Sequence, residues 1–556
     1  MNVTKANFAE AATEIEELLP SALFVAIDEE MTGITLPDQA ELMDDVPATR
    51  YAKLRNVATR YSIIQFGVCL FHAAEGDNSY VARPYNFYLF PDGGAVSLEV
   101  AGIKFLRTHN MDFNKWIYEG VPYYSRSNAV RLRGMLFPEA AAEKTGERKA
   151  PIVLSKKIDI DATSEALEGL EAWLADEAKK DETEYEVMTT NPYLRKYLYD
   201  VVGERYPDLI PQTRKSPTGP PRSAAFVVQR LDEEQKAKRV EAMRAKAEQD
   251  YAEKVGFLRV FNALAEAKKP LVGHNCMCDL LFMLSHFYGA LPECYSRFKQ
   301  AITGLFDLVY DTKLLATRKP FKFVPKEAEA DRTEPRQSRF GSTALGEVFK
   351  VFAEEAASAR EDDTPTVEVS FAQGFERYAG DDKAAAHEAA YDAYMTGYAF
   401  AHMVAQGALT DKCIAKFGNR TPMFRSLFDF NLAGEDSYVY DSFYVHVRGH
   451  KGRSTGDLKA AIQDMMAPGG EPPPSAEIDV RWINDDSSFI VLPRRKAGNL
   501  ETALAKTRSV EGLTFTPGEA WFDARTAAAL GKADGGGDGG AGAAAEEPPR
   551  KRPKAS

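Results

Sequence analysis

The stretch that decides the fold is ALFVAIDEEMTGI, which runs from Ala22 to Ile34. Its apolar first half is typical of a buried β-strand, and three acids follow it. Because side chains alternate between the two faces of a strand, Asp28 and Glu30 are expected on one face and Glu29 on the other. Two like charges on one face are costly unless they share a proton or a cation lies between them. The stretch therefore predicts either a solvated strand end or a site for a hard metal ion.

Length and composition indicate a globular protein of several domains. The chain has 556 residues, of which 44% are hydrophobic and 27% charged, and this length predicts about two to four domains. Its net charge of −13 argues against nonspecific coating of nucleic acid, although a local basic groove remains compatible with it. The five scattered cysteines favour a reducing compartment. His274, Cys276 and Cys278 lack the spacing and the second ligand pair of a structural zinc site.

Strand-like and helical patterns divide the chain into segments. Residues 1–165 and 256–430 are interpreted as one α/β domain in two parts, interrupted at 166–255 by charged helical patterns that predict an inserted module. Residues 325–375 are polar and predict a mobile loop. From 436 to 516 the order strand, helix, strand, strand, helix, strand predicts a ferredoxin-like or RNA-recognition domain.

The two ends of the chain bear on its location. The first residues are too acidic for a transit peptide and lack the core of a signal peptide, and no apolar run is long enough to span a membrane. Residues 530–556 are of low complexity and predict a disordered tail. This tail contains PPRKRPK, a basic cluster of the nuclear-import kind.

Three more residues bear on the paired acids. In LVGHNCMCDLL a short strand leads into a helix, which places Asp279 near the start of that helix. In HEAAYDAYMTG another helix carries Asp392, with His387 five residues earlier. Five helical residues rotate by about 140°, so His387 is expected on the loop that enters the helix, leaning toward the same site. Each residue alone has an ordinary structural interpretation, but the order Asp-x-Glu, Asp, His-x4-Asp rarely arises by chance.

This order of residues resembles that of the DEDD exonucleases of the subtype with a catalytic histidine. Flanking segments such as YAKLRN, IIQFGVCLF, MDFNKWIYEGVPY and DTKLLA extend the likeness. With them the chain resembles the poly(A)-specific ribonuclease family of deadenylases from about residue 7 to 402 and again near 440. The resemblance implies an RNase H-like α/β nuclease core, an inserted small helical or α+β single-strand-binding module, and a C-terminal ferredoxin-like RNA-recognition domain.

The resemblance also implies catalytic roles. It makes Asp28, Glu30, Asp279 and Asp392 the metal ligands and His387 the general base. Carboxylates suit two Mg²⁺ ions, with Mn²⁺ as the expected substitute, and such ions activate water and neutralise the leaving oxygen. A histidine that titrates near neutrality can take the proton of that water.

Further positions match those that contact RNA or the 7-methylguanosine cap in the family. The implied RNA contacts are Met31, Ile34, Asn275 and Lys322. Met31 replaces a phenylalanine of the family, so adenine preference is expected to change without being lost. Trp482 matches the cap-binding tryptophan, whose ring can stack on a methylated base, and a core or dimer role for it stays open.

The inserted module departs from the family pattern. Arg195 is followed four positions later by Tyr199 where the family has histidine. This difference leaves two interpretations open, a single-strand-binding helix and a helix whose basic face is used for packing.

The motifs and the resemblance together predict a magnesium-dependent 3′ exoribonuclease. The activity that the resemblance implies shortens poly(A) tails and releases 5′-AMP. The resemblance also implies a homodimer, and a location in nucleus and cytoplasm is expected. Three alternatives stay open: trimming of the 3′ ends of small noncoding RNAs, a catalytically silent RNA-binding relative, and a DNA proofreading exonuclease. The predicted RNA-recognition domain argues against the last of these.

Overall fold

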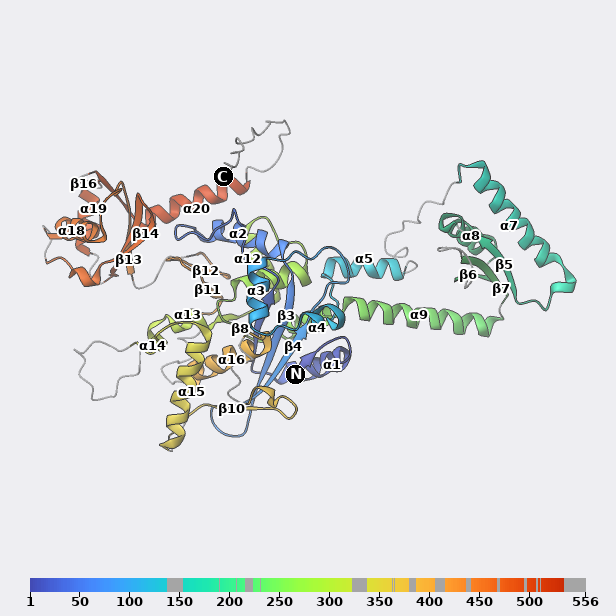
Figure 1. Ribbon diagram of the computed structural model, residues 1–556, viewed down its shortest axis with the longest axis horizontal. Helices are drawn as coiled ribbons and strands as arrows, with labels where there is room; N and C mark the ends of the chain where they lie inside the picture. Colours follow the sequence, from blue (N-terminus) through green and yellow to red (C-terminus); the bar gives the residue numbers. More distant parts are fainter. Residues whose placement is uncertain are drawn as a thin grey trace, which may run out of the picture. The chain divides into compact units, whose positions relative to one another are not determined.

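Figure 1 shows the computed structural model as a ribbon, in which the chain forms two compact units. The structure describes residues 1–137, 154–189, 191–206, 208–215, 224–230, 232–322, 338–362, 364, 366–379, 387–405, 416–436, 442–467, 471–494, 498–506, 509–510 and 512–534. The first unit joins Met1–Ser127 to Val255–Ser556, and the second is the inserted segment Asn128–Lys254.

A mixed sheet is the centre of the first unit. Its order is β1 (Asn2–Val3), β4 (Ser79–Tyr88), β3 (Ile63–Ala73), β2 (Phe24–Met31), β8 (Leu271–Gly273) and β9 (Val309–Asp311), and β10 (Glu368–Phe371) also pairs with β4. Strand β3 is antiparallel to both of its neighbours, β4 and β2, whereas β2, β8 and β9 run parallel. The predicted α/β class is therefore confirmed, and β2 lies at the point where the pairing changes direction.

Helices surround this sheet. They are α1 (Phe8–Leu18), α2 (Pro47–Arg60), α3 (Val100–Thr108), α4 (Phe113–Glu119), α10 (Leu258–Ala267), α11 (Met277–Met283), α12 (Tyr295–Leu305), α13 (Thr312–Ala316), α14 (Lys319–Lys322), α15 (Leu345–Glu361) and α16 (Ala389–Ala405), and α5 (Arg126–Leu136) crosses the boundary of the two units. Helix α16 is buried on nearly all sides, as expected of a helix that is apolar around its whole circumference.

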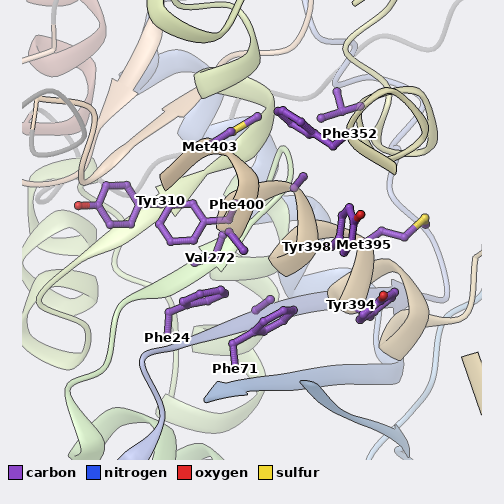
Figure 2. Close-up of a cluster of buried hydrophobic side chains, with 14 of the residues drawn as sticks. Phe24, Phe71, Val272, Tyr310, Phe352, Tyr394, Met395, Tyr398, Phe400 and Met403 are labelled. Atoms are coloured by element: carbon purple, nitrogen blue, oxygen red, sulfur yellow. The ribbon is translucent and has the colours of Figure 1, made fainter. Parts of the chain in front are cut away.

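The main hydrophobic core lies between α16 and the sheet. Figure 2 shows Phe24 of β2, Phe71 of β3 and Phe400 of α16 within this cluster. The Phe24 and Phe71 rings are stacked with centroids 4.7 Å apart, and Phe24 meets Phe400 edge to face at 5.0 Å. Aromatic pairs of this kind add stability beyond the area that they bury. The packing holds α16 against β2 and β3.

The prediction of a mobile loop is wrong for part of the segment. The polar segment 325–375 was expected to be mobile, but it contains α15 and β10. Residues Val348, Phe352 and Ala356 repeat every four positions, are buried and face α16. This apolar face holds the helix against the core, although its outer face is rich in charged residues. Residues 323–337 of the predicted loop lie outside the described part of the chain.

The second unit is an α+β module. Strands β5 (Glu184–Thr189), β7 (Ala224–Arg230) and β6 (Leu209–Lys215) form an antiparallel sheet, with α7 (Lys157–Ala175), α8 (Pro192–Arg205) and α9 (Glu233–Val255). The module was expected at 166–255, whereas the compact unit begins earlier, at Asn128. Buried side chains of α7, among them Leu167, Leu170 and Trp173, belong to its core.

The C-terminal part of the first unit has a sheet of its own. Strand β13 (Ser442–Arg448), α18 (Thr455–Met466), β14 (Asp479–Asn484), β15 (Ser487–Pro493), α19 (Gly498–Lys506) and β17 (Leu513–Pro517) follow the predicted order, with the short β16 (Ser509–Val510) added. The strands lie in the order β14, β15, β13, β17, β16. Buried apolar side chains of the sheet and of α18 and α19 form the core between them.

The last described helix covers part of that sheet. Helix α20 (Gly518–Asp534) places Trp521 against Phe489 of β15 and Phe428, which precedes β12 (Asp429–Asn431) of the small hairpin with β11 (Arg420–Pro422). The disordered tail was expected from residue 530, but α20 continues to Asp534, and the rest lies outside the described residues. Among the described residues, no helix is both long and apolar enough to cross a bilayer.

Candidate active site

The paired acids lie where the sequence places them on β2. Asp28 pairs with Gly67 and Glu30 with Gln65 of β3, and the register shifts directly after Glu30. Glu29 is only 5% exposed, while both of its neighbours are partly open. This pattern is the alternation expected of a strand, and it directs Asp28 and Glu30 to one face.

The parallel strand beside β2 supplies the third acid. Strand β8 ends at Gly273, and the chain turns through Asn275, whose φ is +60°, into α11. Asp279 in the first turn of α11 is 8% exposed. Its Oδ1 accepts a hydrogen bond of 3.1 Å from the backbone N–H of Glu29. This bond ties the start of α11 directly to the acid-bearing strand.

The fourth acid and the histidine come from the start of α16. His387 precedes the helix with φ of +66°, and Asp392 is in its first turn. The backbone N–H of His387 donates to Asp392 Oδ1 at 3.4 Å, and His387 Nδ1 lies 4.0 Å from Asp392 Oδ2. Ala389 N–H donates to the side chain of Gln65 on β3 at 3.3 Å. The helix start is thus held against the strand that pairs with β2.

The four carboxylates influence one another electrostatically. Burial raises the pKa of Asp28 well above its ordinary value, and the charges of Asp392, Asp279 and Glu30 raise it further. Burial, with Asp392 and Asp279, likewise raises the pKa of Glu30. The pKa values of Asp279 and Asp392 rise to about 7, chiefly through burial. Acids that are crowded and partly desolvated in this way favour either protonation or a bound cation.

The spacing of these groups suits a cation. One ligand atom each of Glu30, His387 and Asp392 lies within 4.8 Å of the others. Carboxylate oxygens are the ligands that Mg²⁺ and Mn²⁺ prefer. The donor set and the mutual repulsion of the acids therefore fit a divalent metal ion.

Two aromatic side chains lie beside His387, and no sequence motif predicts them. Phe105 of α3 meets the His387 ring edge to face, with centroids 4.8 Å apart. His109, at the C-cap of α3, lies closer, with its ring centroid 4.1 Å from that of His387. Burial lowers the pKa of His387, and the nearby His109 lowers it further. Neither position belongs to a spaced set of acids, so a search for metal-ligand patterns passes over both.

The residues predicted to contact RNA lie on several different segments. Met31 ends β2 directly after the register shift, and Ile34 is 55% exposed, with its backbone N–H bound to Glu99 Oε2 at 2.8 Å. Asn275 is exposed in the turn that leads to Asp279. Lys322 is exposed at the end of α14.

The C-terminal domain presents Trp482 on its edge strand β14. Its side chain is 38% exposed, its Nε1–H donates to Thr455 Oγ1 at 3.1 Å, and its ring meets the buried His450 edge to face. Phe489 of the neighbouring strand β15 is fully buried and meets Trp521 edge to face. Of these two rings, Trp482 is therefore the accessible one.

In the second unit, Arg195 and Tyr199 lie on α8. Tyr199 is partly buried and meets Phe226 of β7 edge to face, with ring centroids 5.5 Å apart. The aromatic residue at this position is thus used in the packing of the module.

Four crowded acids and a histidine meet on a mixed α/β sheet, and this donor set fits a divalent metal ion. The CAF1 family ribonuclease pattern matches residues 3–400, and the chain belongs to this family of ribonucleases.

The curated relatives are more specific. The chain is 28% identical over 533 residues to the poly(A)-specific ribonuclease PARN of Homo sapiens, covering 88% of this chain and 76% of the relative. It is 26% identical to the same protein of Xenopus laevis, with 88% and 77% covered. A pre-piRNA 3′-exonuclease trimmer of Bombyx mori is 26% identical over 411 residues, with 72% and 70% covered.

A solved structure with some likeness is that of S. pombe Pop2p in a Mg²⁺- and Mn²⁺-bound form. Its TM-score is 0.35 and its identity 12%, over 76% of this chain and 97% of that chain. This is too low a likeness for the two folds to be equated.

Proposed function

We propose that this ribonuclease is a poly(A)-specific 3′ exoribonuclease that releases 5′-AMP. The observation that carries the proposal is the convergence of Asp28, Glu30, Asp279 and Asp392 beside His387. Family membership makes the substrate RNA, and the relatives named poly(A)-specific ribonucleases support adenosine tails as the particular substrate.

The four acids would hold two divalent ions, Mg²⁺ or Mn²⁺. Such ions, when bound, lower the pKa of an attacking water and neutralise the 3′-oxygen that leaves. The acids belong to three segments that hydrogen bonds join, from Glu29 to Asp279 and from Ala389 to Gln65. The ligands are thereby held in place before any ion binds, which is what a preorganised site requires.

His387 would act as the general base. Its lowered pKa keeps the ring neutral near neutral pH, so that a ring nitrogen can accept the proton of the water. The side chain is 41% exposed, and it can therefore meet a substrate that enters from solvent.

The nucleic-acid contacts extend the proposal. Met31, Ile34 and Asn275 border the carboxylates and would contact the terminal nucleotides, with Lys322 on the phosphate chain. The C-terminal domain is proposed to be an RNA-recognition domain on an RNase H-like nuclease, and Trp482 would stack on the 7-methylguanosine cap. A Trp482→Ala variant should lose affinity for a methylated cap analogue and keep its activity on uncapped tails.

The proposal extends to the assembly and the location of the protein. We propose a homodimer that works in nucleus and cytoplasm, with the basic cluster of the tail as the import signal. Analytical ultracentrifugation of the full chain, and imaging with and without that cluster, test the two statements.

A second candidate is the trimming of 3′ ends that are not polyadenylated. The relative named as a pre-piRNA 3′-exonuclease trimmer favours it. The same acids and histidine would serve both reactions, so the choice depends on the bases that the site accepts.

The test compares two 5′-labelled RNAs of one length, one ending in oligo(A) and one in oligo(U). Wild type, Asp28→Asn and the control Asp77→Asn, an exposed acid of the β3–β4 turn, are each assayed with Mg²⁺ and with EDTA. Shortening of the A-tailed RNA alone, lost with EDTA and in Asp28→Asn only, supports the proposal. Equal shortening of both tails favours trimming. Absence of shortening by folded protein favours a silent relative.

A further inference from the structure

His387 is held at its backbone but not by a hydrogen bond of its ring to the acid beside it. Its N–H bonds to Asp392, whereas its Nδ1 lies 4.0 Å from that carboxylate, beyond hydrogen-bond distance. The residue lies before α16 with φ of +66°, so regular helix does not set its side-chain direction. Packing must therefore decide where the ring points.

That packing comes from α3. The rings of Phe105 and His109 have centroids 4.2 Å apart, and both contact the ring of His387, at 4.8 and 4.1 Å. His109 is the nearer of the two. The three rings therefore form one small cluster, in which the ring of His387 contacts both of the others.

His109 is itself firmly placed. Its ring Nδ1 lies 2.9 Å from the carbonyl oxygen of Phe105, so this nitrogen carries the proton and donates. Its backbone N–H donates to Phe105 and Leu106 carbonyls at 3.1 Å, which ends the helix. A ring tied at both backbone and side chain is a rigid surface against which another ring can rest.

We propose that His109 is a positioning residue of this ribonuclease, which holds the ring of His387 in the direction needed to take a proton. The inference rests on the proposed role of His387 as general base. His109 acts through its neighbour and is not assigned any contact with RNA. A general base contributes only when it lies within reach of the proton that it takes, and small misplacements are costly.

The experiment uses the full chain and three variants of one position. His109→Ala removes the ring, His109→Asn keeps a donor near Nδ1 without a ring, and His109→Phe keeps a ring without the donor. Thr108→Ala, an exposed neighbour on the same helix, is the control. For His109→Ala and His109→Asn we expect kcat on an A-tailed RNA to fall about 10-fold with KM unchanged. His109→Phe should restore most of kcat.

A double-mutant cycle separates positioning from mere structural support. In a His387→Ala background, His109→Ala should change the residual kcat by less than about 2-fold. An equal loss in both backgrounds, an unchanged kcat in His109→Ala, or a rise in KM alone would each overturn the proposal.

A second readout does not depend on activity. With only eight histidines in the chain, the ring signals of selectively labelled histidines can be assigned by substitution. The His387 signal should shift in His109→Ala and stay near its wild-type position in His109→Phe; an unmoved signal refutes the positioning role. If wild type shortened no RNA, the proposed function would fail while this signal still tested the contact between the two rings.

Discussion

The close approach of α16 to β3 offers the sharpest test of how the site is assembled. Gly67 pairs with Asp28 across the sheet, and a Cβ added at Gly67 would lie 2.1 Å from the carbonyl oxygen of Ala389. Real Cβ contacts stay beyond 3.0 Å. A Gly67→Ala substitution must therefore move backbone against backbone by about 0.9 Å, the difference between these two distances.

The displacement affects the groups that we propose to be catalytic. Ala389 is the first residue of α16, so the helix start that carries Asp392 and follows His387 has to move away from β3. Overpacking of a core costs about 1–3 kcal/mol, and a misplacement of about 1 Å can cost about 100-fold in rate. We expect Gly67→Ala to lower the free energy of unfolding by about 1–3 kcal/mol and kcat by about 100-fold.

Urea unfolding and the rate of shortening of an A-tailed RNA measure the two effects. Gly93→Ala is the matched control, because an added Cβ at Gly93 meets nothing within 4 Å. If Gly67→Ala kept both the stability and the kcat of the wild type, the close seating of α16 on β3 would not be what aligns the acids.

Three further outcomes are expected. The pKa values of Asp279 and Asp392 are raised in the folded protein, so without metal the melting temperature should fall as pH rises from about 4 to about 7. Mg²⁺ should reverse this loss above pH 7, and melting curves with Mg²⁺ and with EDTA measure the difference. Asp28→Asn should abolish RNA shortening yet stabilise the metal-free protein by on the order of 1 kcal/mol in urea unfolding at pH 8. Trp521→Ala, which removes a buried ring packed on Phe428, should cost about 3–5 kcal/mol by the same method.

The acid-bearing strand could be predicted because its signal is local. The apolar run and alternation in 22–34 predict a strand whose acids face one way, and β2 runs from Phe24 to Met31. His387 also precedes its helix, as the rotation over five residues requires. Each of these features depends on neighbours within a few positions, which is the range over which periodicity carries information.

The features that the sequence did not predict, helix α15 and the role of His109, depend on contacts between residues far apart in the chain. Helix α15 lies in a segment rich in charge, and its apolar residues, among them Val348, Phe349 and Phe352, are covered by packing on α16 and the core beside it. His109 becomes important only because α3 ends where His387 lies, far along the chain. No spacing rule within the sequence brings two such residues together. Tertiary packing decides both cases, as it does wherever local patterns are weak.

The third acid of β2 shows how strand geometry sets the charge of the site. Glu29 faces the other side of the strand, and neither of its carboxylate oxygens has a hydrogen-bond partner among the described residues. Burial, with the nearby charges of Asp279 and Asp28, raises the pKa of Glu29 well above its ordinary value, which favours the neutral form of the group. A bound cation on the open face can compensate the crowding of Asp28 with Glu30, whereas Glu29 relieves its own burial by keeping a proton. Three consecutive acids therefore present only two charges to a metal ion, because alternation along the strand separates them.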